Sequence, residues 1–102
     1  MSKFDYVIVG AGSSGSALAG RLATNKHTKI LLLEAGPEDL NPYIKMPIGY
    51  GKLFYDQSVN WKFYTEPEEN LHGKKMYWPR GKVLGGSSSI NAMVFARGSR
   101  ND

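Results

Sequence analysis

The sequence predicts an α/β fold that begins with a strand–helix–strand unit, and three observations in the N-terminal third support this prediction. Residues 4–9 form a short apolar run rich in β-branched residues, which is typical of a buried strand. A glycine-rich turn then leads into an Ala- and Leu-rich segment, residues 13–25, whose apolar residues recur with helical spacing. A second apolar run, residues 29–34, follows at the spacing that a βαβ unit requires and ends in an acidic residue.

The turn after the first strand has the pattern G-x-G-x-x-G, formed by Gly10, Gly12 and Gly15. The first glycine of this pattern allows a tight turn, the second lets a pyrophosphate approach the backbone, and the third lets the helix pack closely on the sheet. The N-terminus of the helix that follows favours a bound anion. The pattern, in this strand and helix context, predicts a Rossmann-like dinucleotide-binding start.

The acidic residue at the end of the second strand fits the same interpretation. Glu34 follows Gly15 by 19 residues, and a ribose-binding carboxylate is expected about 20 residues after the last glycine. Such a carboxylate accepts hydrogen bonds from the ribose hydroxyls and repels a 2′-phosphate, so NADP is disfavoured. The alternative is that Glu34 only ends a strand beside a Gly-Pro turn. A phosphate-loop NTPase is excluded, because Ser16 and Ala17 stand where that motif needs Lys and then Ser or Thr.

Composition and charge are those of an ordinary soluble domain. The chain has 102 residues, of which 41% are apolar and 22% charged, which suits one small domain. It has no cysteine, so disulfides, thiol nucleophiles and thiolate metal sites are excluded. The net charge is +4, but the Lys and Arg residues are scattered, so we expect no nucleic-acid partner.

Three further expectations concern location and metals. No stretch is long and apolar enough to span a membrane. The start of the chain loosely imitates a signal peptide, but Asp5 interrupts its basic region, and we expect a cytoplasmic protein. Neither His27 nor His72 has a His or Cys partner nearby in the sequence, so we expect both to be solvated loop residues and no metal site.

Residues 36–75 differ from the start of the chain in composition and in the lack of a periodic apolar pattern. Prolines, scattered aromatic residues and little periodicity predict long irregular connections, with one short strand at residues 61–65. So much loop is unusual in a compact domain, so this segment either packs on further parts of a protein or folds over a ligand. Trp61 is a weaker cofactor candidate. The aromatic residues expected to cover apolar surface are Tyr50, Phe54, Tyr55, Trp61, Phe63 and Tyr64.

A second Gly- and Ser-rich stretch occupies residues 78–98. Gly85 and Gly86 permit a backbone that approaches a flat ring closely. Ser87 and Ser88 are good N-caps, so we expect a loop followed by a helix over residues 88–94. Exposed N–H donors at such a helix start would stabilise negative charge.

The two glycine-rich stretches together resemble the glucose-methanol-choline (GMC) oxidoreductases. Asp5 to Gly15, with Leu33-Glu34-Ala35-Gly36, resembles the FAD-binding start of that family, and Gly81 to Asn91 resembles its first signature. Met46-Pro47 and Asn60-Trp61 are similar to the connecting region of choline dehydrogenase-like and bacterial alcohol dehydrogenase members. The resemblance covers nearly the whole chain.

The resemblance implies an FAD enzyme that oxidises an alcohol to a carbonyl by hydride transfer to flavin N5. The reduced flavin would pass its electrons to oxygen, a quinone or another acceptor. Some members bind FAD covalently through a His just before the signature Asn, but Ile90 occupies that position here, so binding should be non-covalent. The implied pyrophosphate contacts are Gly10, Gly12, Ser13, Ser14 and Gly15; Glu34 would bind the ribose, with Ala35 near the adenine. The implied flavin-ring contacts are Val83, Gly86, Ser87, Asn91, Ala92 and Met93.

The same resemblance implies that residues 1–102 are the N-terminal part of the FAD-binding domain. The substrate domain and the C-terminal catalytic His of the family have no counterpart in this sequence, so no catalytic residue is predicted. We expect the fold to be incomplete without further chain, and the 102 residues alone to be inactive. Two alternatives stay open: another FAD or NAD oxidoreductase that shares only the βαβ start, and a stand-alone nucleotide-binding module.

Overall fold

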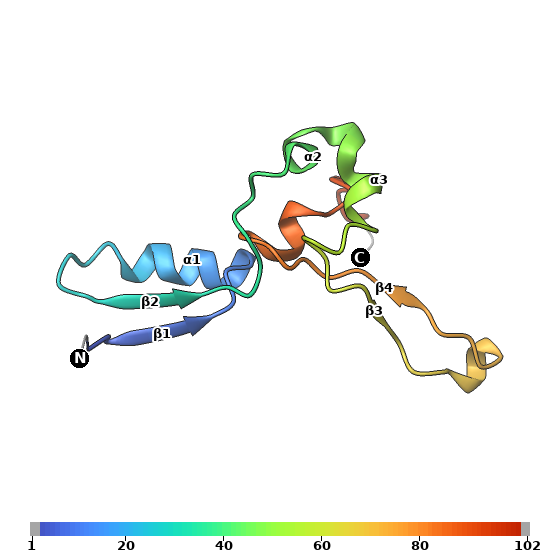
Figure 1. Cartoon of the computed structure of the whole chain (residues 1–102), viewed down its shortest axis with the longest axis horizontal. Helices are drawn as coiled ribbons and strands as arrows, with labels where there is room; N and C mark the ends of the chain where they lie inside the picture. Colours follow the sequence, from blue (N-terminus) through green and yellow to red (C-terminus); the bar gives the residue numbers. More distant parts are fainter. Residues whose placement is uncertain (1–2, 101–102) are drawn as a thin grey trace.

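The computed structural model describes residues 3–100 and contains the predicted strand–helix–strand start. Strand β1 (Tyr6–Val9) and strand β2 (Ile30–Leu33) form a parallel pair, with helix α1 (Ser13–Leu22) as the crossover between them (Figure 1). The helix ends earlier than predicted, because the chain turns at its C-terminus: the Asn25 amide donates to the Leu22 carbonyl at 3.2 Å. The predicted α/β start is therefore confirmed, with shorter elements.

Helix α1 covers one side of the β1–β2 pair and leaves the other side open. A Cβ built on Gly15 in α1 would lie 3.4 Å from the Ile8 side chain, so Ile8 points toward the helix. The alternation of a strand then directs Val7 and Val9 to the opposite side, where they are 58% and 83% exposed. Parallel sheets normally bury both faces, so this unit has an uncovered apolar face.

The chain after β2 contains three short helical elements, where the sequence predicted only irregular connections. These are α2 (Pro42–Lys45), η1 (Pro47–Gly49) and α3 (Tyr50–Leu53). Asn41 caps α2, because its Oδ1 accepts a hydrogen bond from the Tyr43 amide at 3.0 Å. Each element has only three or four residues, so helical periodicity is too short to be read from the sequence.

A cluster of buried apolar side chains joins this region to the second glycine-rich stretch. Leu53, Val59, Val83 and Ile90 are each at most 2% exposed and pack together, with Tyr43 and Ile44 against them. The core thus lies beside the βαβ unit rather than within it, because no residue of α1 is buried.

Asn60 is a buried polar side chain next to this core, with an exposed fraction of 1%. Its amide nitrogen donates to the carbonyls of Leu53 and Phe54 and to the Tyr77 hydroxyl, at 3.3, 2.9 and 3.3 Å. Its Oδ1 accepts from the amides of Lys62 and Arg80, at 2.9 and 3.0 Å. The Asn60 side chain therefore connects the end of α3, the segment after residue 60 and the start of the second glycine-rich stretch.

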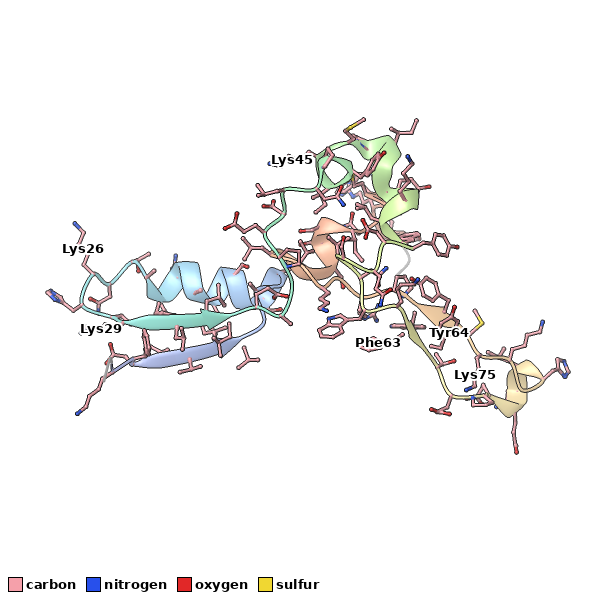
Figure 2. All side chains as sticks on the ribbon, viewed as in Figure 1. Lys26, Lys29, Lys45, Phe63, Tyr64 and Lys75 are labelled. Carbon is pink, nitrogen blue, oxygen red and sulfur yellow. The ribbon has the colours of Figure 1, made fainter. Side chains whose placement is uncertain are left out.

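An antiparallel arm extends away from the rest of the chain (Figures 1 and 2). It consists of β3 (Phe63–Tyr64), β4 (Tyr77–Trp78) and the turn η2 (Glu69–Leu71) between them. The strand predicted at residues 61–65 is thus confirmed in its central part. Phe63 and Tyr64 are 51% and 65% exposed, so the role predicted for these rings, to cover apolar surface, stays a prediction. No helix within residues 3–100 has the length and apolar character needed to cross a membrane.

The prediction of a helix over residues 88–94 is wrong. The structure has a short 3₁₀ segment there, η3 (Gly86–Ser89). The Ser88 hydroxyl donates to the Gly85 carbonyl at 2.6 Å and the Ser89 hydroxyl to the Leu84 carbonyl at 2.9 Å. Such local bonds from serine compete with helix formation. Ser87 and Ser88 are not N-caps here, since η3 has no side-chain cap. Met93 then turns the chain with a φ of +54°, while its amide donates to Asn91 Oδ1 at 2.9 Å.

Candidate cofactor-binding site

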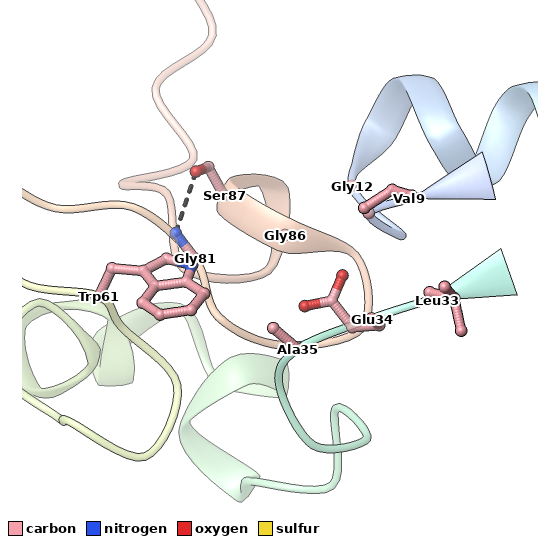
Figure 3. A pocket seen from close by; sticks show the side chains of 10 residues that line it. Val9, Gly12, Leu33, Glu34, Ala35, Trp61, Gly81, Gly86 and Ser87 are labelled. Atoms are coloured by element: carbon pink, nitrogen blue, oxygen red, sulfur yellow. Dashed lines mark hydrogen bonds between the residues drawn. The ribbon is translucent and has the colours of Figure 1, made fainter.

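A cavity of about 580 Å³ opens where the ends of β1 and β2 meet the second glycine-rich stretch (Figure 3). Both predicted motifs contribute to its wall, although they are far apart in the sequence. The lining residues are Val9, Gly10, Gly12, Leu33, Glu34, Ala35, Trp61, Gly81, Gly86 and Ser87. This placement at the carboxyl ends of parallel strands is where open α/β sheets bind ligands.

The two glycine-rich stretches touch through their backbones. The Gly85 amide donates to the Ala11 carbonyl at 2.8 Å, and Gly12 and Gly85 form a parallel bridge. A Cβ on Gly86 would lie 2.8 Å from the Cα of Gly12, and Gly86 has a φ of +61°. A side chain at residue 86 would therefore push the two glycine-rich turns apart. Glycine is required at this position because the two backbones lie in contact there.

The three glycines of the first turn have different environments. Gly10 has a φ of +94°, which favours glycine. A Cβ on Gly15 would lie 1.9 Å from the Gly10 carbonyl oxygen, so Gly15 is needed for the helix to approach the turn. A Cβ on Gly12 would meet nothing closer than 4.0 Å, and Gly12 faces the cavity. The cavity wall is therefore not crowded at Gly12, and the backbone there is open to a ligand.

Glu34 holds the turn that follows β1. Its Oε2 accepts a hydrogen bond from the Ala11 amide at 2.8 Å, and its Oε1 accepts one from the Gly36 amide at 3.0 Å. The side chain does more than end a strand, because it fixes the glycine-rich turn beside β2. Each carboxylate oxygen can accept a further hydrogen bond, so the carboxylate in the cavity wall can still bind hydroxyl groups.

The structure brings together only part of the predicted site residues. Gly10, Gly12, Glu34, Ala35, Gly86 and Ser87 line the cavity. Ser87 also lines a neighbouring cavity of about 260 Å³, together with Asn91 and Ala92. The remaining predicted residues line neither cavity: Ser13, Ser14 and Gly15 lie in the first turn of α1, Val83 is buried in the core, and Met93 is 48% exposed.

Sequence reasoning missed three of the lining residues. Val9 and Leu33 are the last residues of β1 and β2, so the ends of the predicted strands could have indicated them. Gly81 opens the stretch that resembles the family signature, but its contact with Gly86 was not predicted: a Cβ there would lie 2.2 Å from the Gly86 backbone, a contact that only the fold reveals. Trp61, the weaker cofactor candidate, does line the cavity.

Comparison with known families matches residues 4–102 to the family model described as GMC oxidoreductase. The chain belongs to the GMC oxidoreductase family. Two curated GMC-like relatives are similar over nearly all of it. The alcohol dehydrogenase (acceptor) of Pseudomonas putida is 52% identical over 97% of this chain and 18% of its own length. The mitochondrial choline dehydrogenase of Homo sapiens is 47% identical over 98% of this chain and 18% of its own length.

Solved structures agree with this membership of the GMC family. Pyridoxine 4-oxidase from Mesorbium loti matches with a TM-score of 0.86 and 39% identity, over 97% of this chain and 19% of that one. Formate oxidase from Aspergillus oryzae, studied for modification of its FAD, matches with a TM-score of 0.77 and 37% identity, over 86% of this chain and 16% of that one. The predicted fold class is therefore confirmed. This member of the GMC family spans less than a fifth of the length of these relatives.

Proposed function

We propose that the chain is the N-terminal FAD-binding part of an enzyme that oxidises an alcohol to a carbonyl. The observation that carries this proposal is that both GMC motifs line one shared cavity, whose wall is not crowded at Gly12. The names of the dehydrogenase relatives and the FAD of formate oxidase support the same assignment. The short share of those relatives that the chain spans supports a substrate domain and a catalytic part beyond residues 1–102.

The residues around the cavity suit an FAD molecule. We assign the pyrophosphate to Gly10, Gly12 and the start of α1 with Ser13, Ser14 and Gly15, where helix amides and the dipole favour an anion. Glu34 would accept hydrogen bonds from the ribose, and Ala35 would lie near the adenine. When bound, FAD supplies the hydride acceptor. The flavin ring is assigned to Gly86, Ser87, Asn91, Ala92 and Met93, and to Val83 through its backbone, since its side chain is buried.

The remaining parts of the proposal concern the whole enzyme. The substrate is a small alcohol, the electron acceptor is oxygen, a quinone or another compound, and the location is cytoplasmic. The general base that takes the hydroxyl proton is assigned to the part of the enzyme beyond these residues. Fractionation of cells and turnover assays with dye, quinone and oxygen acceptors distinguish among these options.

The full-length enzyme should purify yellow, and acid denaturation should release intact FAD into the supernatant. The reason is that Ile90, at the position of a possible covalent link, has no nucleophilic atom and is buried with an exposed fraction of 2%. Chromatography of the supernatant with FAD and FMN standards measures the result. Flavin that stays with the precipitate would show a covalent link, and FMN or NAD alone in a folded preparation would contradict the proposed cofactor.

Glu34→Gln should weaken FAD binding by roughly ten- to a hundredfold, because hydrogen bonds to a charged group are worth roughly 1.5–3 kcal/mol. The substitution also presents an N–H group where both carboxylate oxygens now accept from backbone amides. Titration of apoenzyme with FAD measures the affinity. Glu38→Gln, on an exposed side chain nearby, is the matched control and should bind FAD normally. Equal FAD retention by the two variants would show that Glu34 does not bind the ribose.

A further inference from the structure

Trp61 lies on the wall of the cofactor cavity, at the side away from Val9 and Gly12 (Figure 3). The side chain is 44% exposed. Large aromatic side chains bury much apolar area when they contact a ligand. An exposed indole that faces a cavity is therefore available as a contact surface for a flat, apolar group.

Neighbouring side chains and the backbone fix the orientation of this indole. The Phe63 ring is stacked on it, with centroids 5.8 Å apart and planes 6° apart. The Lys82 ammonium lies over it, 4.8 Å from the ring centroid. The Trp61 amide donates to the Arg80 carbonyl at 2.9 Å. A side chain held in this way loses little freedom when a ligand binds, so its contact contributes more to affinity.

The order of residues along the cavity indicates which part of FAD would reach Trp61. In Figure 3, Glu34 and Ala35 lie between Gly12 and Trp61. A dinucleotide with its pyrophosphate at Gly12 and its ribose at Glu34 carries the adenine on the far side of that ribose. The adenine is flat and aromatic, and stacking between a base and an aromatic side chain requires no particular hydrogen bonds.

We propose that Trp61 packs against the adenine of bound FAD and that Lys82 acts as a positioning residue for the indole. This inference rests on the proposed function, because it assigns one more contact within the same cofactor site. Lys82 belongs to the second glycine-rich stretch, whereas Trp61 precedes the arm. The contact would thus link a third part of the chain to the two motifs.

Titrations of full-length apoenzyme with FAD and with ADP test the inference. Trp61→Ala should weaken binding of both ligands by about tenfold or more, as loss of base stacking does. Trp61→Phe keeps an aromatic ring, so its affinity for FAD and ADP should fall less than that of Trp61→Ala. Lys82→Met removes the cation over the indole and should weaken both ligands by about two- to fivefold.

The chain offers a matched control for each substitution. Trp78 is 48% exposed and packs with Arg80, but it does not line the cavity, so Trp78→Ala should bind FAD and ADP normally. The Lys52 ammonium lies over the Tyr43 ring at 4.5 Å, also outside the cavity, so Lys52→Met should bind both normally.

The outcomes separate this inference from the proposed function. If the wild-type apoenzyme does not bind FAD, the proposed function is wrong. If the wild type binds FAD but Trp61→Ala binds it equally well, the assignment of Trp61 is wrong. If Trp61→Ala weakens the binding of FAD but not the binding of ADP, the indole does not contact the adenine. Should Trp61→Ala fail to fold, unchanged ADP affinity in Trp61→Phe and Lys82→Met overturns the inference.

Discussion

Gly12→Ala should leave the fold intact and weaken FAD binding by roughly 100-fold or more, since each lost hydrogen bond to a charged group costs roughly 1.5–3 kcal/mol. The added Cβ meets no protein atom closer than 4.0 Å, and the φ of −72° at Gly12 suits alanine. We expect the methyl group to narrow the part of the cavity that Gly12 lines and to displace the pyrophosphate from the amides at the start of α1. Isothermal titration of the apo variant with FAD, beside its melting temperature, measures both effects.

Two glycines within α1, Gly15 and Gly20, serve as controls for this substitution. A Cβ on Gly20 has no neighbour within 4 Å, so Gly20→Ala should bind FAD normally and gain roughly 0.5–1 kcal/mol of stability. A Cβ on Gly15 would clash with the Gly10 carbonyl, so Gly15→Ala should lower stability as well as binding. Normal FAD affinity in Gly12→Ala would mean that the pyrophosphate does not lie at this turn.

Asn60→Asp should lower the free energy of unfolding by about 3–5 kcal/mol, the range for an uncompensated buried charge. The substitution removes the amide that donates to two carbonyls and to the Tyr77 hydroxyl, and it points a negative charge at them. Asn60→Ala leaves partners unsatisfied without adding charge, so a smaller loss of roughly 1–3 kcal/mol is expected. Urea denaturation of the apoenzyme, monitored by circular dichroism, gives these values.

The same Asn-to-Asp change at Asn70 provides the control. Asn70 is exposed in the turn of the arm, and its amide reaches only Glu68 Oε1 at 3.4 Å. Asn70→Asp should change stability by no more than about 0.5 kcal/mol, as surface substitutions usually do. A similar small change in Asn60→Asp would show that the buried hydrogen bonds of Asn60 do not hold the segments together.

The first third of the chain could be predicted well from the sequence because its signals are local. Glycine spacing, an apolar run before the turn and the distance to Glu34 all depend on neighbouring residues or on the fixed length of a βαβ unit. The second role of Glu34, as acceptor from the Ala11 and Gly36 amides, was not predicted, because it depends on how the two strand ends approach each other.

The later part of the chain was harder to predict because its structure depends on contacts between distant residues. Asn60 looks like an ordinary loop residue in the sequence, yet it bonds to residues on both sides of the arm. Ser87 and Ser88 favoured a capped helix in the sequence, but Ser87 Oγ accepts a hydrogen bond from the Gly81 amide and the Ser88 hydroxyl donates to the Gly85 carbonyl instead. In the site, the backbone that crowds Gly86 belongs to Gly12 in the distant first turn, so spacing alone could not reveal why glycine is needed at residue 86.

The backbone contact between the two glycine-rich stretches also affects the order in which parts of the chain fold. Gly12 and Gly86 are 74 positions apart, so the chain must close a long loop before the cavity exists. Closing a loop lowers the entropy of the chain before stabilising contacts between its ends can form. Sites built from distant segments therefore form late. The βαβ unit and the arm can form from neighbouring residues, whereas the cavity is expected among the last parts to assemble. A ligand that touches both turns would then stabilise only the completed state and would draw the folding equilibrium toward it.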